Sequence, residues 1–123
     1  MNSITIPGTM SYPEQLERIK GNMEVLGQGA PGPMKAFSAL HHAAATPGAL
    51  DFKTKELIAL AIGVSLRCNG CIAFHTHDAL EAGATRDEVM EALGVAVLMG
   101  GGPSVIYATH VVEALEQFEN GKR

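Results

Sequence analysis

The order of apolar and polar residues along this 123-residue chain favours helices almost throughout and strands almost nowhere. Apolar side chains lie on nearly every face of residues 52–67, as expected for a helix buried in a core. Residues 94–99 and 105–107 have some strand propensity, but the fold class that we predict is all-α, a single domain of about six helices. The expected helices cover residues 12–26, 33–45, 52–67, 68–83, 86–99 and 103–118.

Local capping signals support these boundaries. Asp51 can cap the helix that follows it. Thr85 and Glu88 form the capping-box pattern T-R-D-E ahead of another helix. Gly83 suits the left-handed residue that ends many helices, and the glycines of segment 100–103 separate the last two helices.

Length and composition indicate one domain, residues 1–123, with an N-terminal helical extension over residues 1–30 and a core over residues 50–118. Charged residues make up only 18% of the chain, so little polar surface is available to cover a small protein. We therefore expect part of the apolar surface to be covered by other copies of the chain in a homo-oligomer.

Charge and hydropathy exclude several classes of protein. The net charge is −4, there is no basic run and there is no Trp, so the chain lacks the electrostatic and stacking features of nucleic-acid binding. The longest apolar run, residues 57–66, is too short to span a bilayer. The N-terminal residues lack the basic and apolar segments of a secretory signal. We expect a cytoplasmic protein that binds neither nucleic acid nor membrane.

The strongest chemical signal is the segment RCNGCIAFH, which holds both cysteines of the chain. If a helix starts at Cys68, then Cys68, Cys71 and His75 form one stripe at i, i+3 and i+7, and Cys71 and His75 can touch. The unpaired N–H groups and the positive dipole end of a helix start favour a thiolate. A neighbouring imidazole can accept the thiol proton and later return it.

Three interpretations of the cysteine pair compete at this point. The pair can be a redox dithiol in which one cysteine attacks a substrate and the other closes a disulfide. It can supply half of a zinc site, but His77 lies about 200° round the helix from His75 and cannot join the same site, which leaves His110 to be considered. Both cysteines can also be small core residues. Outside the cysteine segment, His77 and His110 suit surface, interface or pocket-wall positions.

Glu56 is the candidate partner of the histidine. It begins an apolar stretch, and a carboxylate beside such a helix face lies either at the rim or against a partner in the interior. An antiparallel return of the next helix brings Glu56 and His75 towards each other, although spacing alone does not ensure contact. A Glu–His–Cys relay would orient the imidazole and raise its basicity.

The pattern E-x11-C-x2-C-x3-H, formed by Glu56, Cys68, Cys71 and His75, resembles the alkylhydroperoxidase D-like branch of the carboxymuconolactone decarboxylase family. The resemblance extends over residues 50–118 and implies the helical fold of that branch, assembled as trimers or hexamers. It also implies that Cys71 is the peroxidatic thiol, Cys68 the resolving or partner-exchanging thiol, His75 the base and Glu56 the carboxylate of a proton relay. One departure is Gly70, which stands where the best-known peroxidases of the family have a histidine.

The function we expect is that of a thiol-dependent peroxidase or disulfide oxidoreductase, an antioxidant enzyme that uses the Cys68–Cys71 dithiol. Its substrate would be a small hydroperoxide or disulfide, its reductant an external dithiol, and it would need no metal and no cofactor. One alternative is a lyase acting on a small lactone or keto acid, with Glu56 and His75 as acid and base. A non-enzymatic thiol redox sensor is another.

Overall fold

The structure, a computed structural model, describes residues 10–121 and contains six helices with no strand in that part of the chain. The helices are α1 (Tyr12–Gly29), α2 (Pro31–Ala45), α3 (Phe52–Ser65), α4 (Asn69–Glu81), α5 (Arg86–Gly100) and α6 (Gly102–Gly121). The all-α prediction is confirmed. The first nine residues of the expected N-terminal extension lie outside the described residues. The prediction that the N-terminus lacks a secretory signal concerns these residues.

The predicted capping signals form the expected bonds. The backbone N–H of Thr54 donates to Asp51 Oδ1 at 2.8 Å, at the start of α3. The Glu88 N–H donates to Thr85 Oγ1 at 3.1 Å, and the Thr85 N–H donates to Glu88 Oε1 at 2.8 Å, which completes the capping box of α5. Gly83 is left-handed after the end of α4, with φ of 91°. These helix starts follow from local sequence because each bond joins residues three apart.

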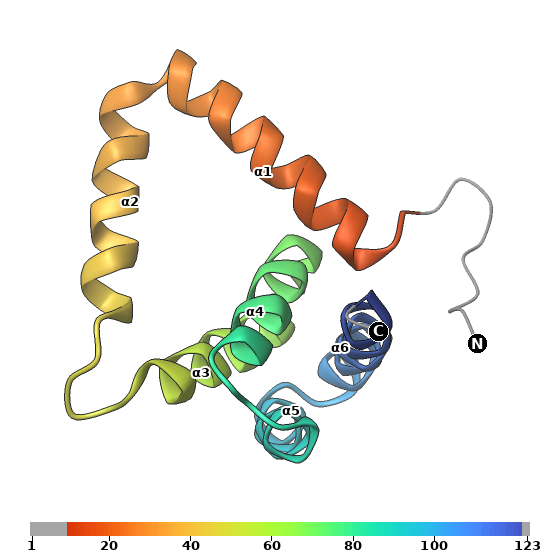
Figure 1. Ribbon diagram of the computed structural model, residues 1–123. Coiled ribbons are helices and arrows are strands. Elements are labelled where there is room, and N and C mark those ends of the chain that lie inside the picture. The colour runs from red at the N-terminus through yellow and green to blue at the C-terminus, as the bar shows by residue number, and fades with distance from the viewer. Residues whose placement is uncertain (1–9, 122–123) are drawn as a thin grey trace.

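Helices α3 to α6 pack into one bundle (Figure 1). Helix α4 packs against α3 and α6, and α5 packs against the same two helices. The core contains fully buried aliphatic residues from all four helices: Leu60, Val64, Ile72, Val89, Val111 and Leu115. The ion pair between Lys53 Nζ and Glu88 Oε2, at 2.8 Å, joins the first turns of α3 and α5 at the surface. The buried aliphatic residues form one hydrophobic core. Helix α3 contributes Leu60 and Val64 to it, whereas Ile58 and Ile62 on its other face are exposed, so α3 is not buried on every side as its apolar sequence predicts.

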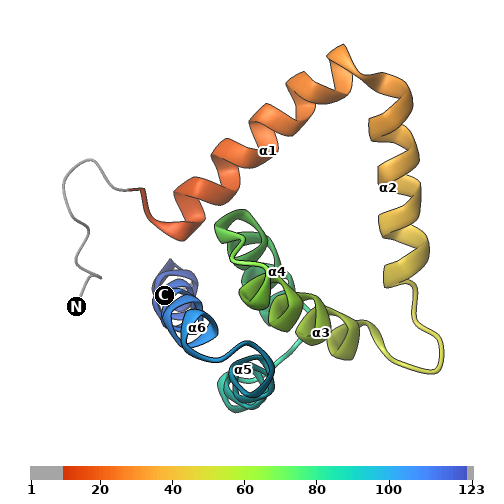
Figure 2. The ribbon, with the colours of Figure 1, turned by 180° about the vertical axis from the view of Figure 1, so that it is seen from behind.

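Helices α1 and α2 form an open V that extends from the bundle, as the views from the front and from behind both show (Figures 1 and 2). Only Tyr12 and Leu16 of α1 are buried, next to α6 and α4. None of the residues of α2, all of which the structure describes, is buried, although the helix carries Phe37 and Leu40. Phe37 and Leu40 are more than half exposed in the single chain. Because tertiary packing supplies most of the stability of a helix in a protein, α2 gains little stability within one chain.

Candidate functional site

The turn between α3 and α4 places the first cysteine. Arg67 is left-handed, with φ of 57°, and its N–H donates to the Val64 carbonyl at 3.0 Å. The N–H of Cys68 donates to the Gly63 carbonyl at 3.1 Å. This pair of bonds is a Schellman motif, which ends α3 at Ser65, two residues earlier than predicted. The reversal brings Cys68 back over the end of α3.

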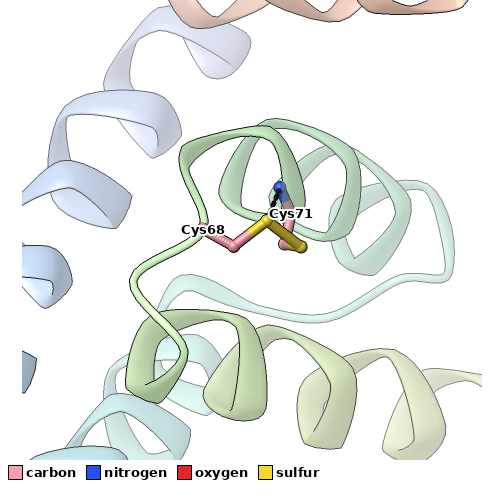
Figure 3. Close-up of a disulfide and its surroundings, with 2 residues drawn as sticks. All are labelled: Cys68 and Cys71. Carbon is pink, nitrogen blue, oxygen red and sulfur yellow. Dashed lines mark hydrogen bonds between the residues drawn. A yellow bond between two sulfur atoms is a disulfide. The ribbon is translucent and has the colours of Figure 1, made fainter.

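Cys68 and Cys71 form a disulfide at the start of α4 (Figure 3). Cys68 is the N-cap residue of the helix, and its Sγ accepts a hydrogen bond from the backbone N–H of Cys71 at 3.1 Å. In the reduced protein, the same N–H and the positive end of the helix would stabilise a thiolate on Cys68. The expected position of the cysteine pair at a helix start is therefore confirmed, with the helix beginning one residue later, at Asn69.

Helix α3 approaches Cys71 closely because it has no side chain at position 63. A Cβ added to Gly63 would lie 2.9 Å from the Cβ of Cys71, which is closer than real Cβ contacts allow. The two helices can therefore approach at this point only if residue 63 is glycine. Gly63 thus sets the separation between α3 and the second cysteine.

We expect Gly63→Ala to destabilise the chain by about 1–2 kcal/mol, because the overpacking cost exceeds the gain in helix propensity. The measurement is urea unfolding of the oxidised protein. Gly21→Ala is the matched control, since its new Cβ would have nothing within 4 Å, and it should be neutral or stabilising by up to about 1 kcal/mol. Equal or greater stability of Gly63→Ala would contradict the close packing.

The carboxylate–imidazole pair predicted from spacing is formed by direct contact. His75 Nδ1 lies 2.8 Å from Glu56 Oε1. The Glu56 side chain is 4% exposed and the His75 side chain 21% exposed, so the carboxylate lies in the interior and the imidazole reaches towards the surface. An ionised Glu56 would hold the proton on Nδ1 and leave Nε2 free to exchange one, as a general base requires.

One further acid lies beside this pair. Glu56, His75 and Asp78 each present a ligand atom within 4.8 Å of the others, so these three residues could hold a divalent cation. Asp78 follows His75 at i+3 and extends the stripe formed by Cys71 and His75, a spacing that would have predicted it. The cysteines are not members of this group.

His77 and His110 form hydrogen bonds with residues other than Glu56 and His75. His77 Nδ1 lies 2.9 Å from Asp78 Oδ1, and the ring lines a hollow of about 280 Å³ between α1, α4 and α6. His110, on α6, lies with its Nδ1 3.1 Å from Oδ1 of Asn69, the residue between Cys68 and Gly70. The sequence analysis considered His110 only as a possible zinc ligand, and its bond to Asn69 could not be predicted because the two residues are 41 positions apart.

The space beside Gly70 is occupied by the first helix. A Cβ added at Gly70 would lie 3.3 Å from Ile19 Cδ1, so a side chain there requires the end of the Ile19 side chain to shift by a few tenths of an ångström. The lack of a side chain at position 70 thus goes together with the position of α1 next to the start of α4.

The fold and the site define the class of protein: an all-α bundle with a cysteine pair at the start of one helix and, on the same helix, an imidazole that contacts a buried carboxylate. A profile of the carboxymuconolactone decarboxylase family matches residues 31–114, and the chain belongs to this family. The family prediction made from the motif is confirmed.

Relatives and solved structures agree with this membership. An uncharacterized protein of Cupriavidus necator is 39% identical over 90% of this chain and 96% of its own length. A family protein from Legionella pneumophila, solved in its apo form, is 45% identical and superposes with a TM-score of 0.85 over 87% of this chain and 96% of its own. A family protein from Thermotoga maritima, described as a candidate for a role in the antioxidative response, is 36% identical over 73% of this chain and 93% of its own, with a TM-score of 0.69.

Proposed function

We propose that this chain is a thiol-dependent oxidoreductase that reduces small hydroperoxides or disulfides with the Cys68–Cys71 dithiol. The observation that carries the proposal is the arrangement of the cysteine pair at the start of α4, one turn before an imidazole that a buried carboxylate holds at 2.8 Å. A dithiol on a helix start supplies the nucleophile, and the pair supplies proton transfer. The antioxidative description of the Thermotoga maritima protein supports the same chemistry.

The peroxide reaction has two steps on the protein. The Cys71 thiolate attacks an oxygen of the hydroperoxide, the O–O bond breaks, and the leaving alkoxide takes a proton from the imidazolium of His75 to become an alcohol. Cys71 is left as a sulfenic acid, and the thiol of Cys68 condenses with it to give the disulfide and water. An external dithiol then reduces the disulfide by exchange and is itself oxidised, which returns both thiols.

The positions of the two cysteines support the roles that we propose for them. Cys71 shares the α4 stripe with His75, so it suits the peroxidatic role, and Glu56 orients the base. Cys68 has its Sγ at the N-cap, which suits the resolving or partner-exchanging role. We place the protein in the cytoplasm, whose reducing pool supplies such dithiols. In the described residues no helix is long and apolar enough to cross a membrane.

The proposal predicts a fixed stoichiometry. Reduced protein mixed with one equivalent of a small hydroperoxide should lose two free thiols per chain and gain one Cys68–Cys71 disulfide, which thiol counting by mass spectrometry measures. A dithiol should then restore both thiols and support further turnover. Loss of thiols without turnover would instead favour a redox sensor, and no loss of thiols would exclude the peroxidase activity.

A second candidate function rests on the carboxylate–imidazole pair alone. Glu56 and His75 could serve as acid and base in a lyase acting on a small lactone or keto acid, and the decarboxylase of the family name fits such chemistry. Lyase activity would not depend on whether the Cys68–Cys71 disulfide is formed. Equal turnover by the oxidised and the reduced protein would therefore favour a lyase.

We also infer that the protein is a homo-oligomer, a trimer or a hexamer. Large apolar side chains are exposed both on α1 and α2 and on the bundle. Those on α1 and α2 are Val25, Leu26, Phe37 and Leu40, and those on the bundle are Ile62, Leu66, Val95, Leu98 and Met99. Such extensive apolar exposure is unusual for a monomer and typical of an interface.

Light scattering should therefore give a mass of three or six chains. Leu98, which is 79% exposed, is the most accessible of these side chains, and Leu98→Asp should shift the mass towards the monomer by burying a charge in the interface. Glu116→Lys, at an exposed polar position of α6, is the control for a charge change and should leave the mass unchanged. A monomeric parent protein would contradict the inference.

A further inference from the structure

The first residue of α4 receives hydrogen bonds from two other helices. Asn69 is itself exposed, yet its Oδ1 lies 3.3 Å from the hydroxyl oxygen of Tyr12 on α1 and 3.1 Å from Nδ1 of His110 on α6. Both are donors to the same oxygen. Three helices thus meet at the side chain that directly follows Cys68.

The Tyr12 donor is held in place and stays protonated. The residue is 5% exposed, and its backbone N–H donates to Oε1 of the buried Gln117 at 2.6 Å. Burial raises the pKa of Tyr12 to about 12, with Glu113 and Tyr107 acting in the same direction. The hydroxyl is therefore available to Asn69 throughout the physiological pH range.

The His110 donor is fixed in one tautomer. Since Oδ1 of Asn69 only accepts, Nδ1 of His110 must carry a hydrogen to make this bond. The bond persists when Nε2 is also protonated. The ring of Tyr107 lies against the imidazole, with ring centroids 4.9 Å apart, and limits its rotation.

We propose that Asn69, Tyr12 and His110 form a clamp that positions Cys68, and that His110 and Asn69 are positioning residues for the dithiol. The clamp acts on the α1 and α6 side of the cysteine pair, whereas the Glu56–His75 pair acts from the α3 side. The inference rests on the proposed dithiol function and adds to it the residues that control the reactivity of the first cysteine.

The physical link is the N-cap bond. The Cys71 N–H reaches the Sγ of Cys68 at 3.1 Å only while the first turn of α4 keeps its geometry. Asn69 is the residue inside that turn whose side chain is tied to other helices. Without the clamp, the turn would fray, the N–H would align less well with the sulfur, and a thiolate on Cys68 would lose part of its stabilisation.

Several charged or titratable groups surround the clamp and bear on any pH measurement. Arg67, an exposed cation, directly precedes Cys68 in the turn. From α1 comes Tyr12, and from α6 come Tyr107, His110 and Glu113. Replacing a clamp residue with one of the same charge therefore separates positioning from electrostatics.

The test measures the ionisation of Cys68 directly. In a Cys71→Ser background, which leaves Cys68 as the single thiol, the ultraviolet absorbance of the thiolate is followed against pH. Asn69→Ala should raise the pKa of Cys68 and leave about three- to tenfold less thiolate at a pH below it, the size expected for weakening one hydrogen bond to a charged group. His110→Ala should shift the titration in the same direction.

Three conservative variants separate positioning from a general structural role. His110→Asn keeps a donor near the Nδ1 position and should restore most of the thiolate lost in His110→Ala. Tyr12→Phe removes a clamp donor and should raise the pKa of Cys68. Tyr107→Phe keeps a ring against His110 and should leave the titration of Cys68 unchanged. A Cys68 titration unaltered in both Asn69→Ala and His110→Ala overturns the clamp.

The titration needs no turnover, so it fails separately from the proposed function. A clamp-dependent Cys68 in a protein that reduces neither hydroperoxides nor disulfides would overturn the function and keep the clamp. Dithiol turnover with a clamp-independent Cys68 would do the reverse.

Discussion

Replacing Cys71 with serine is expected to lower the rate of hydroperoxide reduction by a factor on the order of 10³ or more, because a hydroxyl near its ordinary pKa cannot replace a thiolate nucleophile. The measurement is consumption of a small hydroperoxide in the presence of excess dithiol. Folding of the variant is checked by its helical circular dichroism, since the disulfide closes a loop of only a few residues and its loss should leave the bundle intact.

Cys68→Ser is the matched variant for the second step. It should still react once with the hydroperoxide and accumulate a sulfenic acid on Cys71, which a sulfenic-acid-specific reagent detects. Turnover should then depend on how fast an external thiol attacks that acid. If Cys71→Ser consumes hydroperoxide as fast as the parent, or if Cys68 rather than Cys71 forms the sulfenic acid, the assignment of the two thiols is wrong.

Replacing Glu56 with glutamine is expected to give the second large effect, a loss of about 10²- to 10³-fold in kcat/KM. The amide keeps the size of the carboxylate but cannot hold an imidazolium at 2.8 Å by charge, so His75 becomes a poorer proton carrier. The measurement is steady-state kinetics with hydroperoxide, together with the pH profile of kcat/KM. The profile should change shape in the variant, which a merely structural role of Glu56 would not produce.

Glu116→Gln on the exposed face of α6 is the control for removal of a carboxylate and should leave the kinetics unchanged. Glu56→Gln combined with His75→Gln should cost little more than either change alone, because residues that act as one unit are not additive. Additive losses would show that the two residues act independently. Unchanged hydroperoxide kinetics in Glu56→Gln would remove the relay from the mechanism.

The same four residues also decide between the two candidate functions. A variant that lacks both cysteines should be inactive as an oxidoreductase but unimpaired as a lyase, since the Glu56–His75 pair remains. Activity on a lactone or keto acid that survives in this variant would therefore favour the lyase.

Local sequence was sufficient for the helices and for the order of the site residues on α4. The bonds from Asp51 and Thr85 that start α3 and α5 join residues three apart, and a left-handed glycine ends α4 regardless of its neighbours. The i, i+3, i+7 stripe of Cys68, Cys71 and His75 needs only a helix to exist. These features depend on interactions within a single turn, which residue types and spacing determine.

The end of α3 illustrates where local reasoning failed. The helix was expected to continue to residue 67, but Arg67 adopts the left-handed conformation that usually belongs to glycine. The Schellman bonds and the packing of α4 on α3 offset the conformational cost. No feature of the arginine itself indicates this turn, so its position and the path of the chain into Cys68 came from the tertiary structure.

Contacts between helices were decided by packing alone. Spacing placed Glu56 and His75 on facing helices but did not settle whether they touch, and the close approach at Gly63 is part of what brings α3 and α4 near enough for a 2.8 Å contact. The bonds from Tyr12 and His110 to Asn69 join residues 57 and 41 positions apart, so no periodicity relates them.

The sequence by itself determined an all-α chain, its family and the candidate site residues, because helix capping and a four-residue motif are encoded over short distances. The tertiary structure decided which of those residues meet, which sulfur lies on the helix N-terminus, and which side chains from α1 and α6 reach the cysteine pair. The physical reason is that a hydrogen bond between helices depends on their separation and rotation to within a fraction of an ångström. That precision is set by the packing of side chains throughout the bundle.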